Sequence, residues 1–148
     1  MLRIAICEDD PRYLEFIAAA VDKTIARHNL IGQIVCKAHA PHVLVEFLKH
    51  NTANLFLMDI DLGTQENGYI LAQKIRENNK KAYIVFISAH LEYVLQAFKI
   101  KPFDFLPKPV TGEILEKCVL EVYNDYICEN AQDENSYIKI RSGIKIFR

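Results

Sequence analysis

The residues of this sequence that could take part in chemistry follow short apolar runs. In chain order they are Glu8, Asp9 and Asp10 after Leu2–Cys7, Asp59 after Leu55–Met58, Ser88 after Tyr83–Ile87, and Lys108 after Phe103–Leu106. If these runs are parallel strands of one sheet, their carboxyl ends lie at the same edge, where open α/β sheets bind ligands. The sequence therefore predicts carboxylates, a hydroxyl and an ammonium group close together at one edge.

Such a group of charges has a definite chemistry. Clustered carboxylates repel one another, and a divalent cation and a lysine would both relieve the repulsion. A site rich in oxygen ligands suits Mg²⁺, which accepts one or two carboxylates together with phosphate oxygens. A carboxylate beside this ion can attack phosphorus and form an aspartyl phosphate. We therefore expect Mg²⁺ as the cofactor and Asp59 as the phosphoryl acceptor, with Lys108 and Ser88 contacting the phosphoryl oxygens.

Each of these residues taken alone has an ordinary structural explanation. The acids at 8–10 could only satisfy the N-terminus of a helix. Ser88 could be a turn residue, and Lys108 could be a solvated surface lysine. Their joint placement after four different apolar runs is the observation that favours a functional site.

The rest of the sequence alternates between apolar runs and helical spacing. Residues 34–38 add a strand to the four runs above, and Asp10-Pro11 supplies an N-cap and a first helical residue. Helices are expected over residues 11–28 and 43–48, from Asn67-Gly68 onward, over 91–98, and from Thr111 onward. Strands that alternate with helices predict an α/β fold with a doubly wound parallel sheet covered on both faces.

Composition and charge exclude several classes of protein. Hydrophobic residues make up 51% and charged residues 25% of the 148 residues, as in a packed globular domain. The net charge of -1 gives no general attraction to nucleic acid or to an anionic membrane. No apolar stretch approaches the roughly 20 residues of a membrane helix. The four cysteines lack metal-site spacing and fit a reducing compartment, so we expect a cytoplasmic protein without a membrane partner.

The motifs of residues 1–128 are similar to those of the receiver domain of bacterial two-component response regulators. The matching segments are Ile-Cys-Glu-Asp-Asp-Pro at 6–11, Leu-Met-Asp-Ile-Asp at 57–61, Asn-Gly at 67–68, Ile-Ser-Ala at 87–89, and Phe-Asp-Phe-Leu-Pro-Lys-Pro at 103–109. The resemblance implies a flavodoxin-like (βα)5 fold with strand order 2-1-3-4-5. It also implies a sensor histidine kinase as phosphoryl donor, a homodimer formed on phosphorylation, and no turnover of an external substrate.

The resemblance further implies a role for each matching residue. Asp59 is the phospho-acceptor. Glu8 and Asp9 are the acidic pair that holds the metal with Asp59, with Asp9 as the more direct ligand, and Asp61 lends its backbone carbonyl. The remaining roles are the switch hydroxyl of Ser88, the switch aromatic ring of Phe105, the phosphoryl-stabilising Lys108, and a cis peptide bond before Pro109.

The end of the sequence differs in character from the rest. Tyr-Ile-Lys-Ile-Arg-Ser-Gly at 137–143 resembles the opening strands of the LytTR DNA-binding domain, and residues 96–106 look like receivers joined to that domain, the accessory-gene-regulator type among them. We therefore expect a receiver domain over 1–128, a linker over 129–135, and a short β tail over 136–148 that opens a truncated LytTR domain. DNA would be bound only through the missing part of that domain, by which the parent protein controls transcription.

Two other functions are considered. Asp59-Ile-Asp61-Leu-Gly-Thr64 resembles the Asp-x-Asp signature of haloacid-dehalogenase-type phosphatases, which also form aspartyl phosphates. In those enzymes the signature follows the first strand and a later acidic pair holds Mg²⁺, whereas here the acidic group precedes Asp59. The second alternative is a pseudo-receiver that only binds a partner protein, and phosphorylation in vitro would separate it from a true receiver.

Overall fold

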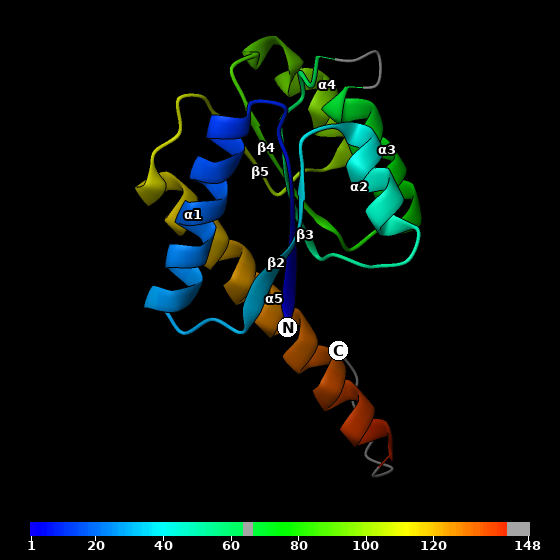
Figure 1. The fold of residues 1–148 in the computed structure, drawn as a ribbon. Coiled ribbons are helices and arrows are strands. Elements are labelled where there is room, and N and C mark those ends of the chain that lie inside the picture. The colour runs from blue at the N-terminus through cyan, green and yellow to red at the C-terminus, as the bar shows by residue number, and fades with distance from the viewer. Residues whose placement is uncertain (64–66, 142–148) are drawn as a thin grey trace.

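The computed structural model of the chain describes residues 1–63 and 67–141, with side chains described up to Ala131. Its centre is a parallel sheet of five strands in the order β2-β1-β3-β4-β5, as expected (Figure 1). The strands are β1 (Leu2–Cys7), β2 (Gly32–Ala38), β3 (Leu55–Met58), β4 (Tyr83–Ser88) and β5 (Asp104–Pro107). The described part of the chain contains no helix that is long and apolar enough to cross a membrane.

One face of the sheet is covered by α1 (Pro11–Arg27) and α5 (Gly112–Arg141). The helices present apolar residues at helical spacing, and the strands present alternate residues, because successive strand side chains point to opposite faces. The buried members of this layer include Ile4, Ile6, Leu57, Val85, Ile17, Val21, Leu115 and Val122.

The other face is covered by α2 (Pro41–Leu48), α3 (Gly68–Asn78) and the segment after β4. The intervening strand residues, such as Phe56 and Phe86, point to this side and are buried. The short helix expected over 91–98 is a series of three turns: η1 (Leu91–Tyr93), α4 (Val94–Ala97) and η2 (Phe98–Ile100). Lys101 ends the series with a left-handed backbone, φ 57°.

Helix α5 corrects part of the expectation for the end of the chain. Thr111 caps it as expected, since Thr111 Oγ1 accepts a hydrogen bond from Ile114 N at 3.2 Å. The helix then continues to Arg141, so residues 137–141 are helical and do not form the strand expected from Tyr137, and the linker expected over 129–135 is helical. The physical reason is that no glycine or proline occurs between Gly112 and Gly143, so nothing stops the helix. Residues 142–148 lie outside the described residues, and the division into domains stays a prediction.

Gly68 brings α3 against the end of β3. Its N–H donates to Ile60 O at 2.7 Å, and a Cβ at this position would overlap the carbonyl oxygen of Asp59. Gly112, at the start of α5, has open space around the corresponding position. The first glycine is therefore required by a close backbone approach, and the second is not.

We predict that Gly68→Ala lowers the free energy of unfolding by at least about 2 kcal/mol, because the added methyl group forces α3 away from Asp59. Gly112→Ala is the matched control and should leave stability unchanged or raise it by up to about 1 kcal/mol. Urea denaturation followed by circular dichroism measures both. Equal stability of the two variants would contradict the close approach.

Candidate functional site

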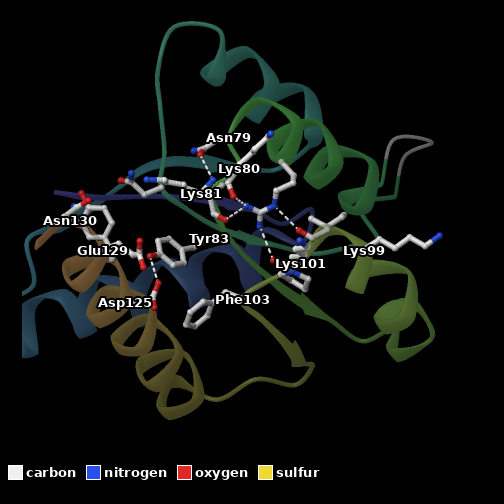
Figure 2. Close-up of a pocket in the computed structure, with 16 residues that line it drawn as sticks. Asn79, Lys80, Lys81, Tyr83, Lys99, Lys101, Phe103, Asp125, Glu129 and Asn130 are labelled. Carbon is white, nitrogen blue, oxygen red and sulfur yellow. Dashed lines mark hydrogen bonds between the residues drawn. The ribbon is translucent and has the colours of Figure 1, made fainter. Parts of the chain in front are cut away.

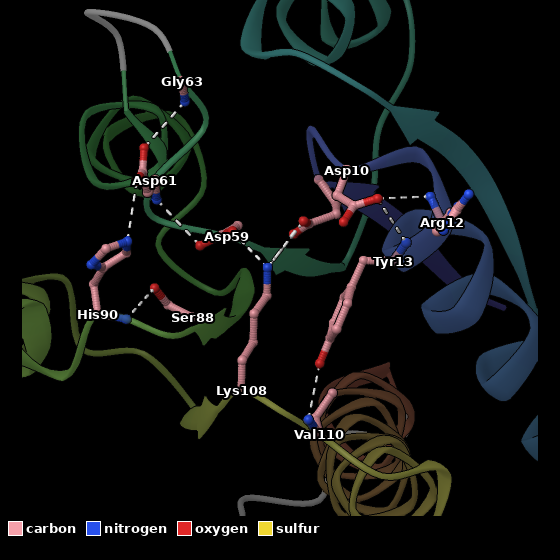
Figure 3. Close-up of polar contacts among 11 residues, drawn as sticks. Asp10, Arg12, Tyr13, Asp59, Asp61, Gly63, Ser88, His90, Lys108 and Val110 are labelled. Atoms are coloured by element: carbon pink, nitrogen blue, oxygen red, sulfur yellow. Dashed lines mark hydrogen bonds and ion pairs between the residues drawn. The ribbon is translucent and has the colours of Figure 1, made fainter.

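Three charged side chains meet at the carboxyl edge of the sheet (Figure 3). Lys108 Nζ lies 3.0 Å from each carboxylate oxygen of Glu8 and 2.7 Å from Asp59 Oδ2. The two acidic residues are almost fully buried, at 1% and 6% exposure. One ammonium group therefore bridges two buried carboxylates, as the strand-end pattern predicted.

The backbone fixes these residues to neighbouring strands. Asp59 N donates to Cys7 O at 3.1 Å, and Glu8 N donates to Ala38 O at 2.9 Å. Lys108 N donates to Ser88 O at 3.0 Å. The Lys108–Pro109 peptide bond, expected to be cis, is cis in the structure. Each charged residue is thus held by the sheet ladder of the strand beside it.

Burial and the contacts between Lys108, Glu8 and Asp59 change the pKa values of Glu8 and Lys108. Burial raises the pKa of Glu8 from 4.5 to about 7, and the charge of Asp59 adds to the rise, although the hydrogen bond from Lys108 opposes it. Burial lowers the pKa of Lys108, but the hydrogen bonds and charges of Asp59 and Glu8 outweigh burial and raise it. Lys108 is therefore a permanent cation here, while Glu8 is poised to take up a proton.

A third carboxylate completes an oxygen cluster. Carboxylate oxygens of Glu8, Asp9 and Asp59 all lie within 4.8 Å of one another, and Asp9 is exposed while the other two are buried. Such a set of hard oxygen donors, open to solvent on one side, fits a divalent cation. Asp10 does not belong to this set, because its Oδ1 accepts from Arg12 N at 2.9 Å and from Tyr13 N at 3.4 Å as the N-cap of α1.

The side chain of Asp61 turns away from the cluster. Asp61 N donates to Asp59 Oδ1 at 3.2 Å, while its own carboxylate accepts from Gly63 N at 3.2 Å and pairs with His90 Nε2 at 3.1 Å. This arrangement is compatible with the expected role of its backbone carbonyl. The His90 contact was not expected from the sequence, although a histidine two residues after the candidate hydroxyl is a visible signal.

The two candidate switch residues lie on adjacent strands. Ser88 is fully buried, and its Oγ accepts from His90 N at 3.1 Å. Phe105 is half-buried, with its ring 6.1 Å from that of Phe86 in the layer under α3 and α4. Ser88 therefore ends β4, as the sequence predicted, and Phe105 lies in β5 and packs against the layer that includes Ala97 of α4.

A cavity of about 870 Å³ is lined by residues of α3, α5 and the loops before β4 and β5 (Figure 2). The Arg76 guanidinium in its wall donates to the carbonyl oxygens of Lys80, Ala82, Ile100 and Lys101 at 2.7–3.1 Å. Arg76 is thus occupied in joining two loops, and Figure 2 shows Lys99 extending away from it.

Comparison with known proteins identifies the family of the chain. The model of the response regulator receiver domain family matches residues 4–120. The chain belongs to this family. Accessory gene regulator protein A of Staphylococcus aureus is 27% identical over 121 residues, which are 80% of this chain and 51% of that protein. The Staphylococcus epidermidis protein of the same name is 27% identical over 116 residues, or 76% of this chain and 49% of that one.

Solved structures give the same fold. The response regulatory domain of mrkE from Klebsiella pneumoniae has a TM-score of 0.76 at 23% identity, covering 84% of this chain and 98% of that one. The receiver domain of AraT from Geobacillus stearothermophilus has a TM-score of 0.75 at 19% identity, covering 87% and 98%. The chain spans about half the length of the curated relatives it matches. Membership of the receiver family argues against the phosphatase alternative for Asp59-Ile-Asp61.

The raised pKa of Glu8 predicts a pH dependence of stability. The unfolded chain releases this proton near pH 4.5 and the folded protein releases it near pH 7, so the folded state holds more protons in between. Stability contributed by this group therefore falls as pH rises through that window. Glu8→Gln removes the titration, so its stability relative to wild type should increase from pH 4.5 to pH 7 by on the order of 2 kcal/mol.

Urea denaturation in the presence of a metal chelator, at pH values from 4.5 to 7, measures this change in stability. Glu46→Gln, in the exposed part of α2, is the control and should follow wild type at all pH values. Parallel profiles for wild type and Glu8→Gln would contradict the assignment.

Proposed function

We propose that this receiver domain accepts a phosphoryl group on Asp59 from a sensor histidine kinase and signals by a change of conformation. The observation that supports the proposal is the bridge from Lys108 Nζ to Asp59 and Glu8, beside a third carboxylate on Asp9. It joins a nucleophilic carboxylate, a fixed cation and a set of metal ligands at one point. A pseudo-receiver that only binds a partner protein would not require these three kinds of group at one point.

The transfer follows from the placement of Asp59. A carboxylate oxygen of Asp59 attacks phosphorus, the new P–O bond forms, and the bond from phosphorus to the donor breaks. The donor atom, an imidazole nitrogen of the kinase, keeps the electron pair of that bond. Lys108 exchanges its contact with Asp59 Oδ2 for a phosphoryl oxygen and so neutralises part of the new charge. The hydroxyl of Ser88 donates a hydrogen bond to another of these oxygens.

The carboxylates of Glu8, Asp9 and Asp59 and the carbonyl of Asp61 would hold Mg²⁺. When bound, this ion neutralises phosphoryl charge that the single cation of Lys108 cannot balance alone. Asp9 is its more direct ligand, because it is the exposed member of the cluster and its carboxylate has no Lys108 contact within the described interactions.

The phosphorylated state would be transmitted through Ser88 and Phe105. Movement of the buried Ser88 toward the phosphoryl group vacates space under α4, and the ring of Phe105 is placed to fill it. The face formed by α4, β5 and α5 would then form the homodimer. Large apolar side chains of α4 and of η2, which follows it, are exposed, with Leu95 at 87% and Phe98 at 76%.

We propose that a protein containing this receiver acts in the cytoplasm and controls transcription through a C-terminal LytTR-type DNA-binding domain. The similarity to the accessory gene regulator proteins, of which the chain spans about half, supports this proposal. The receiver itself would not turn over an external substrate, because the phosphoryl group ends on its own side chain.

The proposed acceptor is tested by intact-mass measurement. Incubation with a small phosphodonor and Mg²⁺ should add the mass of one phosphoryl group to wild type, and Asp59→Asn should add none. Asp22→Asn, an exposed substitution in α1, is the control and should be labelled like wild type. Full labelling of Asp59→Asn, or an unlabelled wild type, would reject the acceptor role.

Asp9 and Asp10 are neighbours but are expected to have different roles, Asp9 as a metal ligand and Asp10 as the N-cap of α1. Asp9→Asn should weaken Mg²⁺ binding about tenfold or more, because it removes a charged ligand. Asp10→Asn should leave the affinity within about twofold and cost little stability, because asparagine is an equally good N-cap. Titration with Mg²⁺ followed by tyrosine fluorescence gives both affinities. Equal losses in the two variants would contradict the assignment.

A further inference from the structure

Tyr13, in the first turn of α1, contacts the Lys108 segment in two ways (Figure 3). Its ring lies under the ammonium group, with Lys108 Nζ 4.4 Å from the ring centroid. Its hydroxyl accepts a hydrogen bond from Val110 N at 2.9 Å. One side chain of α1 therefore contacts both the reactive end of Lys108 and the backbone two residues beyond it.

These contacts complete the surroundings of the ammonium group. Glu8 and Asp59 provide its hydrogen bonds, and the aromatic face of Tyr13 provides an attractive surface that needs no hydrogen bond. A lysine side chain is long and flexible, so its position depends on what surrounds its end. The side chain of Lys108 is 16% exposed, which leaves it little room to move elsewhere.

The aromatic contact matters most when the hydrogen bonds change. During transfer, the Asp59 oxygen held by Lys108 becomes part of an acyl phosphate, and the ammonium must turn to a phosphoryl oxygen. The contact with Tyr13 does not involve the reacting groups, so it can persist through this exchange and keep the cation at the site while its partners are replaced.

We propose that Tyr13 is a positioning residue for phosphoryl transfer: its ring holds the Lys108 ammonium at the acidic edge, and its hydroxyl fixes the segment after Lys108. This inference rests on the proposed function of Asp59. The alternative is that Tyr13 only packs α1, since its ring also meets Phe16 edge-on at 5.7 Å.

Two substitutions separate the two contacts of Tyr13. Tyr13→Phe keeps the ring and removes the hydroxyl, so phosphorylation by a small phosphodonor with Mg²⁺ should slow by less than about threefold. Tyr13→Leu removes the ring and should slow it by about 5- to 30-fold, the equivalent of a lost cation–π contact. Phe16→Leu removes the neighbouring ring, which does not contact Lys108, and should stay within about twofold of wild type.

A spectroscopic signal tests the contact without any phosphorylation. In protein labelled with ¹³C-lysine, the Hε signals of Lys108, assigned with Lys108→Arg, should be shifted upfield by the ring current of Tyr13. The shift should remain in Tyr13→Phe and disappear in Tyr13→Leu. Circular dichroism confirms that each variant is folded at the temperature of the assays.

The outcomes are distinct. Three results would overturn the positioning role and leave the function of Asp59 intact. They are a phosphorylation rate of Tyr13→Leu equal to that of wild type, a rate of Tyr13→Phe as low as that of Tyr13→Leu, and a loss of rate in Phe16→Leu equal to that in Tyr13→Leu. A wild type that shows the ring-current shift but takes up no phosphoryl group would overturn the proposed function, and the positioning role with it.

Discussion

The structure depends on one ammonium group that balances two buried carboxylates. Glu8 and Asp59 lie at the ends of β1 and β3, where burial without a cation would be costly. Lys108 reaches them from the end of β5 and leaves the pair with one uncompensated negative charge. Burial raises the pKa of Glu8, and the negative charge of Asp59 adds to the rise. A bound divalent cation would remove the imbalance, which explains why a site of this composition favours a metal and a phosphoryl group together.

The fold serves this interaction by fixing the groups before any ligand arrives. The parallel ladder aligns the ends of β1, β3, β4 and β5, and the helices on both faces bury the strands that carry them. Gly68 lets α3 approach the backbone of Asp59, and Asp10 starts α1 directly after the acidic pair. Tyr13 then brings the first turn of α1 onto Lys108. Electrostatic groups fixed in this way need little rearrangement when charge moves onto the acceptor.

Much of this arrangement could be predicted from the sequence, because it depends on local patterns. Apolar runs gave the bounds of β1 and β3, and Asp10 and Thr111 were identifiable as caps. Parallel strands then require Glu8, Asp59 and Lys108 to meet. The contacts of Tyr13 and His90 could not be predicted, because they depend on side-chain directions from a helix and a loop. The strand expected from Tyr137 was wrong for residues 137–141, which are helical. The alternation of apolar and basic residues there predicts a strand, but no glycine or proline ends the preceding helix.

The central claim is that the phosphoryl group is attached to Asp59 and to no other carboxylate of the cluster. Borohydride reduces an aspartyl phosphate to homoserine, so treatment of the phosphorylated protein followed by peptide sequencing in the mass spectrometer locates the group directly. The account predicts homoserine at position 59 alone, and only in samples that received both Mg²⁺ and phosphodonor. Homoserine at position 9 or 61, with aspartate intact at 59, would contradict it.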